Sequence, residues 1–508
     1  MKVLIIADSP SWAIGKLSEA IIKHKGENSP DMALIFVHPR DAMLEKSINL
    51  VKAQIADADV IHFQYWNTAQ QLIKAIPELK NRKTVLTHHN QKNLLSEDWA
   101  ALGIKQHVVH TKKSKDVLEK AGYKNVKIIQ HGIDHKLFEF RDERPTEKMF
   151  GYVGRVVPWK GLKEISKASR ELGYPLLMMG KQDKIDYWES IDMYDRNNII
   201  GGYINCKDQE RFEAYNDMSV YVGNSADGRE EGPLGLLEAM ACGTPVVTTP
   251  SGEAADICVD GKNCLMVPFE DYDALKKAMN RLMTDDKLAD ELRSNAWNTV
   301  KGMTEEKMAL EYRRLYKKVL YENKPLISVI VPYTKDRQEF VDQIKSAYKG
   351  QDYAAIEVLA VEDSEQGYNL AKMRNLAAID ADGEILIFND SRILPDKDVA
   401  EVVINYFNMY QDSNRVWVFG NKGGNKKSFV ENFSAIRRDH FIRGGMCNER
   451  INLYGGMSQE LRERFMFSNF QFVFADDMKA TTLCSTHKTR DRRQQIIKSK
   501  FQLYKMGL

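Results

Sequence analysis

Short apolar runs alternate with amphipathic stretches from the start of the chain to about residue 324. The first series reads KVLIIAD, ALIFVH, DVIHFQYW, KTVLTHH, QHVVHT and VKIIQHG, and the second reads MFGYVGR, PLLMMG, NNIIGGY, SVYVGN and TPVVTT. Continuous apolar runs of this length are typical of strands that a parallel sheet buries on both faces. Two series therefore predict two doubly wound α/β domains, joined near the polar stretch 138–147.

A third region begins after a long charged helix that we expect at 304–322, where the residues NKP form a linker. A new strand, LISVIVPYT, is followed by IEVLAVED and EILIFND, with helices expected at 339–349, 368–379 and near 459–464. The pattern predicts an α/β protein with domains at residues 1–145, 146–322 and 326–508. The last helix of the second domain is expected to pack back on the first.

Composition changes this picture little. The 508 residues are 43% hydrophobic and 28% charged, with a net charge of +2, as in an ordinary globular protein. No apolar run approaches the roughly 20 residues of a membrane span, and the first residues are typical of a strand rather than a signal peptide. The six cysteines include no CxxC pair, so neither a disulfide framework nor a zinc site is expected, and a cytoplasmic location is favoured.

Candidate chemistry is densest between positions 229 and 253, in REEGPLGLLEAMACGTPVVTTPSGE. A loop broken by Gly and Pro leads there into a helix, whose first N–H groups have no partners within the helix and attract an anion. The backbone of Leu234 and Gly235 would cradle a phosphate. Glu230 and Glu238 flank that point and could hold hydroxyl groups, so the segment predicts a nucleotide-sugar site.

Three motifs carry a family resemblance over residues 1–322, strongest at 150–268. They are GYVGRVVPWKG, the E-x7-E block that begins at Glu230, and IIQHGID. Together they resemble the GT-B glycosyltransferases of the retaining family 4. The resemblance implies two Rossmann-like domains, and a cleft that takes UDP-sugar or another nucleoside-diphosphate sugar. It also implies transfer without a metal ion or other cofactor.

By the same resemblance, Arg155 and Lys160 clamp the diphosphate, and Gly154 lets the chain approach the phosphates closely. Glu238 is expected to bond the ribose and Glu230 the donor sugar, although Glu231 competes for that role. His89 is expected near the reacting sugar, with His88 as the alternative, because neighbours on a strand point in opposite directions.

The family's glycine-rich loop after the first strand is poorly matched, with Gly15 alone. Because that loop faces the acceptor, its departure leaves the acceptor open. Trp12 and Lys16 are candidates for acceptor contacts, and local packing is the alternative for both.

Residues 326–508 resemble a GT-A glycosyltransferase of family 2 through SVIVPYTKDR, VLAVEDS and AKMRNLAAIDADGEILIFND. Glu362 and Asp363 are then expected to bind base and ribose. Asp390 matches the first aspartate of the family's metal-binding DxD motif, but Arg392 replaces the second, and a cation there repels a divalent ion.

Two interpretations of this third domain stay open. Either Arg392 takes over the role of the metal, or the module no longer catalyses transfer. Met457 and Ser458 replace the acidic residues of a second family motif, although Glu460 remains. His487 is a weak candidate for a metal ligand.

The expected function is transfer of a sugar to a hydroxyl group of a glycan or lipid-linked glycan. A bifunctional enzyme that adds two sugars in sequence is one alternative, and a sugar-nucleotide-binding scaffold is another. The basic end KTRDRRQQIIKSK, with aromatic residues nearby, also admits a nucleic-acid partner and a DNA glycosyltransferase of hydroxymethylated bases. Those aromatic residues are Phe465, Phe467, Phe470 and Phe472.

Overall fold

The computed structural model describes residues 1–10, 13–24, 30–180, 184–201, 208–322, 324–363, 369–410, 415–422, 429, 431–451 and 457–483. The chain divides into two compact units, Met1–Val319 and Leu320–Leu508, and each is described by itself.

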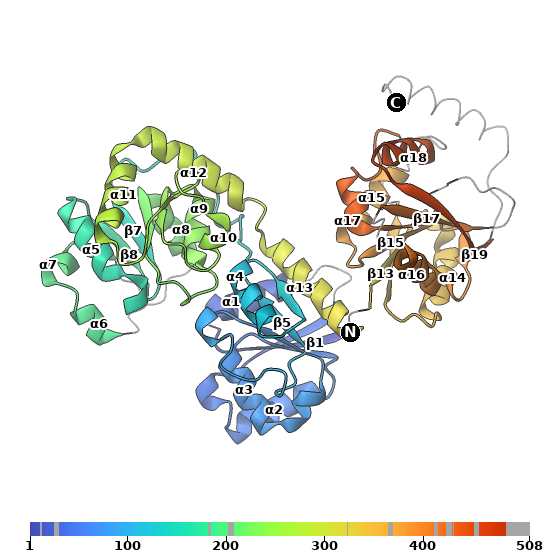
Figure 1. Ribbon diagram of the computed structural model, residues 1–508, viewed down its shortest axis with the longest axis horizontal. Coiled ribbons are helices and arrows are strands. Elements are labelled where there is room, and N and C mark those ends of the chain that lie inside the picture. Colours follow the sequence, from blue (N-terminus) through green and yellow to red (C-terminus); the bar gives the residue numbers. More distant parts are fainter. Residues whose placement is uncertain are drawn as a thin grey trace. The chain divides into compact units, whose positions relative to one another are not determined.

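The first unit begins with a six-stranded sheet in the order β2-β1-β3-β4-β5-β6 (Figure 1). Every strand pair is parallel, and β3, β4 and β5 are buried at every position, which explains their continuous apolar sequence. The strands are β1 Lys2–Ala7, β2 Asp31–Phe36, β3 Val60–Phe63, β4 Thr84–Thr87, β5 Gln106–Val109 and β6 Val126–Ile128. The helices are α1 Ala13–Lys23, α2 Glu45–Ile55, α3 Trp66–Ala75 and α4 Lys112–Lys120.

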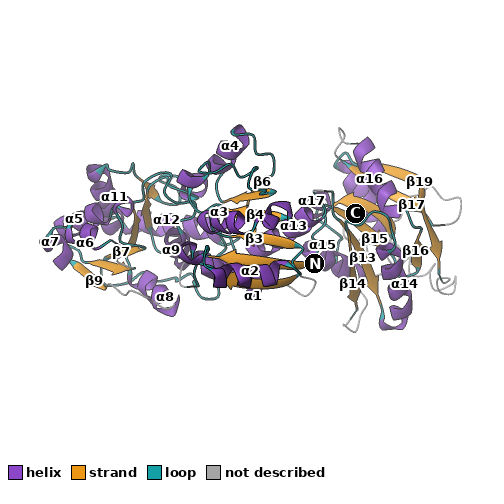
Figure 2. Ribbon diagram, turned by 90° about the horizontal axis from the view of Figure 1, so that it is seen from below, coloured by secondary structure: helices purple, strands orange, loops and turns teal. Residues whose placement is uncertain are grey.

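A second six-stranded parallel sheet of the first unit has the order β12-β11-β10-β7-β8-β9. Its strands are β7 Phe150–Val153, β8 Leu176–Met179, β9 Ile199–Gly201, β10 Val220–Gly223, β11 Val246–Thr248 and β12 Leu265–Met266. Its helices are α5 Leu162–Glu171, α6 Ile185–Glu189, α7 Met193–Asn197, α8 Asp208–Asp217, α9 Leu234–Cys242, α10 Ala254–Ile257, α11 Tyr272–Thr284 and α12 Asp286–Val300. In Figure 2 the strands of both sheets form layers against which these helices pack.

Helix α13, Glu305–Leu320, returns from the second sheet to the first. Tyr316 Oη lies 2.7 Å from Nδ1 of His62 on β3, and Tyr312 Oη lies 3.2 Å from Oγ1 of Thr87 on β4. Both contacts are buried, so this helix ties the two sheets together as parts of one unit.

The second unit has a seven-stranded mixed sheet in the order β14-β13-β15-β18-β17-β19-β16. The first three strands are parallel, whereas β18 is antiparallel to both of its neighbours. The strands are β13 Ile327–Tyr333, β14 Ile356–Glu362, β15 Ile385–Asn389, β16 Ile393–Pro395, β17 Val416–Asn421, β18 Phe433–Arg437 and β19 Gln471–Thr482. The helices are α14 Gln338–Lys349, α15 Leu370–Asp380, α16 Val399–Met409, α17 Arg438–Arg443 and α18 Met457–Phe467.

None of the helices that the structure describes is long and apolar enough to cross a membrane.

Candidate active site

The first unit holds a cleft of about 460 Å³ between its two sheets. Its walls come from segments that follow β1, β3 and β4 of the first sheet, and β7, β10 and β11 of the second. Clefts at the carboxyl ends of parallel strands are the usual ligand sites of doubly wound folds. Every residue that the sequence predicted for the donor site lines it: His89, Gly154, Arg155, Lys160, Glu230, Leu234, Gly235 and Glu238.

Lys160 and Glu230 form an ion pair in this cleft, between Nζ and Oε2. Burial alone would raise the pKa of Glu230, but the cations Lys160 and Arg155 outweigh it, so the pKa lies below its usual value. The carboxylate is therefore charged at neutral pH. An incoming anion would meet a lysine that this carboxylate already holds in position.

The position of Lys160 depends on a short 3₁₀ turn, Pro158–Lys160, that ends at Gly161. Gly161 has φ +58°, in the left-handed region, and a Cβ there would lie 2.3 Å from Nδ2 of Asn224. Only glycine satisfies both conditions, which explains the Lys-Gly pair of the motif.

Three aromatic and cationic side chains form the neighbouring wall. The guanidinium groups of Arg155 and Arg229 lie 5.7 and 5.2 Å from the ring centroid of Trp159. Such contacts hold a guanidinium in place while it keeps its charge. With Lys160, this part of the cleft thus presents three cations to a ligand.

Helix α9 begins in the same cleft with Pro233 at its N-cap and no side-chain cap. The N–H of Leu234 donates to the carbonyl of Gly232 at 3.1 Å, so it is already used within the loop. A Cβ on Gly235 would lie 2.8 Å from the Tyr221 hydroxyl, so the absence of a side chain allows the backbone to pack closely here. The helix dipole adds to the positive potential of the cleft.

Glu238, in the second turn of α9, is buried and held by two neighbours. Tyr215 Oη donates to its Oε2 at 2.8 Å, and Nη1 of Arg211 lies 3.0 Å from Oε1. These contacts orient the carboxylate where it lines the cleft.

The structure separates Glu230 from its neighbour Glu231. Glu231 is buried away from the cleft, where its Oε2 accepts from the N–H of His110 at 3.0 Å and its Oε1 accepts from the hydroxyl of Ser114. Burial raises its pKa to about 7. Glu231 therefore joins the two halves of the unit, and Glu230 is the residue that faces a ligand.

The same distinction holds for the two adjacent histidines. His89 lines the cleft, with Nε2 3.1 Å from Oε1 of Gln64. His88 is buried behind it, with Nε2 3.0 Å from Nδ1 of His107 and its ring edge against Trp99. His89 is thus the histidine available to a substrate.

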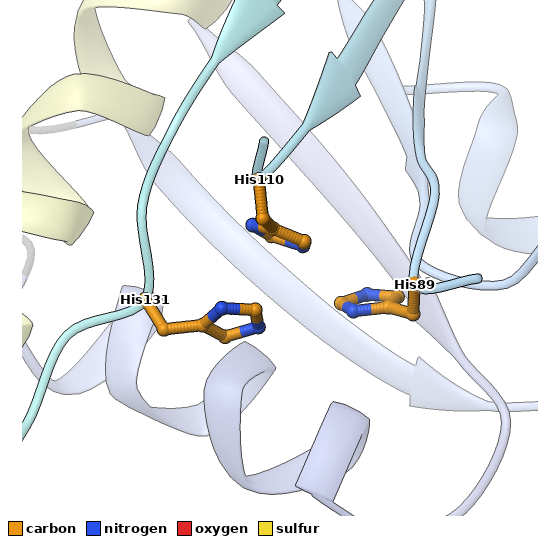
Figure 3. Close-up of side chains that lie close together, drawn as sticks. All are labelled: His89, His110 and His131. Carbon is orange, nitrogen blue, oxygen red and sulfur yellow. The ribbon is translucent and has the colours of Figure 1, made fainter. Parts of the chain in front are cut away.

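Three histidine rings meet beside this point, from segments that the sequence did not connect. Figure 3 shows His89, His110 and His131 pointing toward one another. One ring nitrogen of each lies within 4.8 Å of one from each of the others. His131 is fixed by Glu253, whose carboxylate lies 2.8 Å from Nδ1 and accepts the backbone N–H at 2.9 Å.

Several residues of the cleft escaped the sequence analysis, among them Asp8, Tyr65 and Arg211. Asp8 directly follows β1, and a polar residue at the end of a buried strand is a signal that could have found it. Burial raises the pKa of Asp8. Arg211 lies in α8, whose sequence carries no motif, so only the fold brings it to Glu238.

In the second unit, Asp390 and Arg392 occupy the turn after β15. Arg392 donates through Nε to Oδ1 of Asp390 at 2.8 Å, and a second contact joins Nη2 to Oδ2. Burial opposes the charge, but this arginine outweighs it and lowers the pKa of Asp390. Both carboxylate oxygens are therefore engaged by a cation.

A second buried ion pair lies in the same unit. Arg374 donates to Oε1 of Glu431 at 2.9 Å, and the hydroxyl of Ser458 donates to the other oxygen. Glu362 is the last residue of β14 and Asp363 follows it; β13, the parallel neighbour of β14, also pairs with β15. They therefore lie at the same edge of the sheet as Asp390.

Several predicted contacts lie elsewhere. Ala13, Ile14 and Leu17 of α1 line the cleft, whereas Lys16 of the same helix does not. Glu460 is bound by Arg464, whose Nε lies 2.6 Å from Oε1. Trp12, His487 and the basic segment 488–500 lie outside the described residues.

Comparison with known proteins identifies part of the chain. Residues 134–299 match the family described as glycosyl transferases group 1. The chain therefore carries a glycosyltransferase group 1 domain. The matched range contains the second parallel sheet and the cleft residues named above from Gly154 to Glu238.

Curated relatives agree with this assignment. An uncharacterized glycosyltransferase of Methanocaldococcus jannaschii is 26% identical over 215 residues, which is 39% of this chain and 54% of the relative. The capsular polysaccharide biosynthesis glycosyltransferase CapM of Staphylococcus aureus is 25% identical over 189 residues, which is 34% of this chain and 48% of CapM. The matches thus span about half the length of these relatives.

A solved structure shares the fold. The HepE protein of Anabaena, solved in complex with UDP and glucose, aligns with a TM-score of 0.53 at 16% identity, over 62% of this chain and 99% of that chain. Two Rossmann-like domains around a cleft, the GT-B arrangement, describe the first unit well.

Proposed function

We propose that the first unit is a retaining glycosyltransferase of GT-B family 4 that moves a sugar from a nucleoside-diphosphate sugar to a hydroxyl acceptor. The observation that carries the proposal is the convergence of Arg155, Lys160 and the start of α9 with Glu230 and Glu238 in one cleft. Cations and a helix N-terminus suit a diphosphate, and carboxylates suit sugar hydroxyls. UDP is the first nucleotide to test, because HepE was solved with UDP and glucose.

The chemistry follows from the charges. The bond from the anomeric carbon to the diphosphate oxygen breaks, and a bond to the acceptor oxygen forms, while the acceptor proton passes to the leaving diphosphate. Arg155 and Lys160 stabilise the charge that develops on that diphosphate. In this proposal Glu230 releases Lys160 to the phosphates and binds the sugar. No metal ion is needed at the diphosphate.

The acceptor enters opposite the donor, beside His89 and Asp8, both of which line the cleft. We propose a hydroxyl of a glycan or lipid-linked glycan, since CapM is named for capsular polysaccharide biosynthesis. A cytoplasmic location fits a nucleotide-sugar donor.

Donor binding tests the proposal most directly. Thermal shift against UDP-, GDP-, ADP- and TDP-sugars is expected to reveal one donor that stabilises the protein by mass action. Glu238→Gln should weaken the binding of that donor by roughly 10- to 100-fold, because a hydrogen bond to a charged group is lost. The exposed Glu291→Gln on α12 is the matched control. If no sugar nucleotide binds the wild type, the proposal fails.

For the second unit we propose the second of the two interpretations, a GT-A-like module that no longer catalyses transfer. Arg392 engages both oxygens of Asp390. A divalent ion would therefore meet an occupied carboxylate and a nearby positive charge. Such a module would bind a nucleotide or acceptor without catalysing a second transfer.

Product analysis separates this module from a second catalytic site. Mass spectrometry of the acceptor is expected to show one added sugar in both the wild type and Asp390→Ala, and far less of that product in Lys160→Ala. If the wild type adds two sugars and Asp390→Ala adds one, the chain is bifunctional and this part of the proposal is wrong.

A further inference from the structure

We propose that His89, His110 and His131 form a binding site for one divalent transition-metal ion of the zinc type at the edge of the cleft (Figure 3). The site is separate from the diphosphate clamp of Arg155 and Lys160, and it does not depend on the transferase proposal. Three arguments support it: the protonation of the rings, their anchoring, and their geometry.

Hydrogen bonds fix which nitrogen carries the proton in two of the rings. Nδ1 of His110 lies 2.7 Å from the carbonyl oxygen of Ile129, which can only accept, so Nδ1 must hold the proton. The same reasoning places the proton of His131 on Nδ1, against the carboxylate of Glu253. Both rings therefore keep a lone pair on Nε2.

One of those lone pairs has no donor to satisfy it. Nε2 of His110 is buried and has no partner in the part of the chain that the structure describes. A buried acceptor without a donor costs free energy, and a cation removes that cost.

The anchoring of the rings is typical of metal ligands. Histidines that bind metals almost always donate their other N–H to a carboxylate or a backbone carbonyl. His131 does so to Glu253 and His110 to Ile129. Glu253 is fully buried, so its carboxylate contacts the His131 ring and not solvent.

The spacing fits a tetrahedral ion after a small adjustment. Zinc–nitrogen bonds of about 2.0–2.1 Å place tetrahedral ligands about 3.4 Å apart. One nitrogen of each ring lies within 4.8 Å of one nitrogen of each of the other two, so small side-chain movements would close the site. Three histidines with an open fourth position suit Zn²⁺ or Co²⁺, and His89 and His131 open that position to the cleft.

The ion would also tie the catalytic loop to the first sheet. A Cβ on Gly232 would lie 2.0 Å from the His131 ring, so the backbone beside Glu230 packs directly on this histidine. The preceding residue, Glu231, accepts from the N–H of His110. A metal that fixes both rings would therefore hold the loop that carries Glu230.

Cobalt titration of the full-length, chelator-treated protein tests the site. One equivalent of Co²⁺ is expected to give the intense visible absorption of a tetrahedral ion, and one equivalent of Zn²⁺ should remove it. Glu253→Gln should weaken Co²⁺ binding about 10- to 100-fold, as expected for the loss of a carboxylate behind a ligand.

Two histidine variants complete the test. His110→Ala should abolish the absorption, whereas His107→Gln removes a buried histidine outside the cluster and should retain it. The proposal is overturned if the wild type gives no tetrahedral spectrum, a result that needs no variant to fold. It is also overturned if His110→Ala binds Co²⁺ as tightly as the wild type. Metal content is the readout, so a failed transferase proposal would leave the result intact.

Discussion

At the scale of single residues, neighbours in sequence differ in role because the backbone turns them in different directions. Glu230 pairs with Lys160 in the cleft, while Glu231 is buried against His110 and Ser114. A carboxylate that is buried beside a cation stays charged and can exchange that cation for a ligand. The same group buried beside neutral donors becomes a structural link.

Lys160→Ala tests the first of these roles. The variant is expected to lower kcat by about 10²- to 10³-fold, the usual cost of losing one group that stabilises charge in the transition state. Steady-state transfer kinetics measure it, with Lys163→Ala, an exposed lysine on the following helix, as the control. A loss no larger than that of the control would remove Lys160 from the clamp.

At the scale of elements, the site depends on how a strand passes into a helix. The chain leaves β7, makes the turn Pro158–Lys160 and enters α5 through Gly161, which has a left-handed conformation. The second such passage leads from β10 to α9 and carries Glu230 and the helix N-terminus. Both passages end at the cleft because their strands are parallel.

Gly161→Ala should lower the free energy of unfolding by about 1–2 kcal/mol from its left-handed conformation alone, and the contact with Asn224 adds to that cost. Gly302→Ala is the matched control, because nothing lies within 4 Å of the added Cβ. Urea unfolding compares the two variants. Equal midpoints would show that the turn tolerates a side chain.

At the scale of the whole molecule, buried titratable groups make stability depend on pH. Burial lowers the pKa of His62, His110 and His131 to about 3, and that of His107 to about 4. The unfolded chain, with a histidine pKa of 6.5, binds more protons between those values. Stability therefore falls as the pH drops from 6.5 toward 3.

Buried carboxylates with a raised pKa oppose this trend. Burial raises the pKa of Glu231 and Glu253 to about 7 from 4.5, so the folded state binds their protons more tightly and stability falls as the pH rises through that interval. Below pH 6.5 the histidines with a lowered pKa, which include His88 and His89, outnumber the carboxylates with a raised pKa, Asp8, Glu231 and Glu253. Above pH 6.5 the effect of Glu231 and Glu253 remains. Maximum stability is therefore expected near neutral pH.

The variant His62→Gln tests this pH dependence. His62 is fully buried, and its ring nitrogens contact Tyr316 and Thr87. Unfolding free energies of the variant should fall less steeply than those of the wild type between pH 6.5 and 4. Parallel curves for the two proteins would contradict the assignment.

The sequence by itself determined the α/β alternation, the first-unit sheets and the donor motifs, because each of these depends on residues that are close together along the chain. Parallel buried strands need continuous apolar runs, and phosphate-binding turns need glycine beside charge. Arg155, Lys160, Glu230 and Glu238 were therefore predictable, and the structure brings all four into one cleft.

Only the tertiary structure decided what depends on long-range contact. Of the two adjacent histidines, His88 contacts His107 on β5, and His89 lines the cleft. That choice depends on the packing around the end of β4. Asp8, Arg211 and the histidine cluster come from different strands and helices, and no spacing along the chain relates them. His110 and His131 looked like ordinary residues because their partners, Glu231 and Glu253, lie more than a hundred positions away.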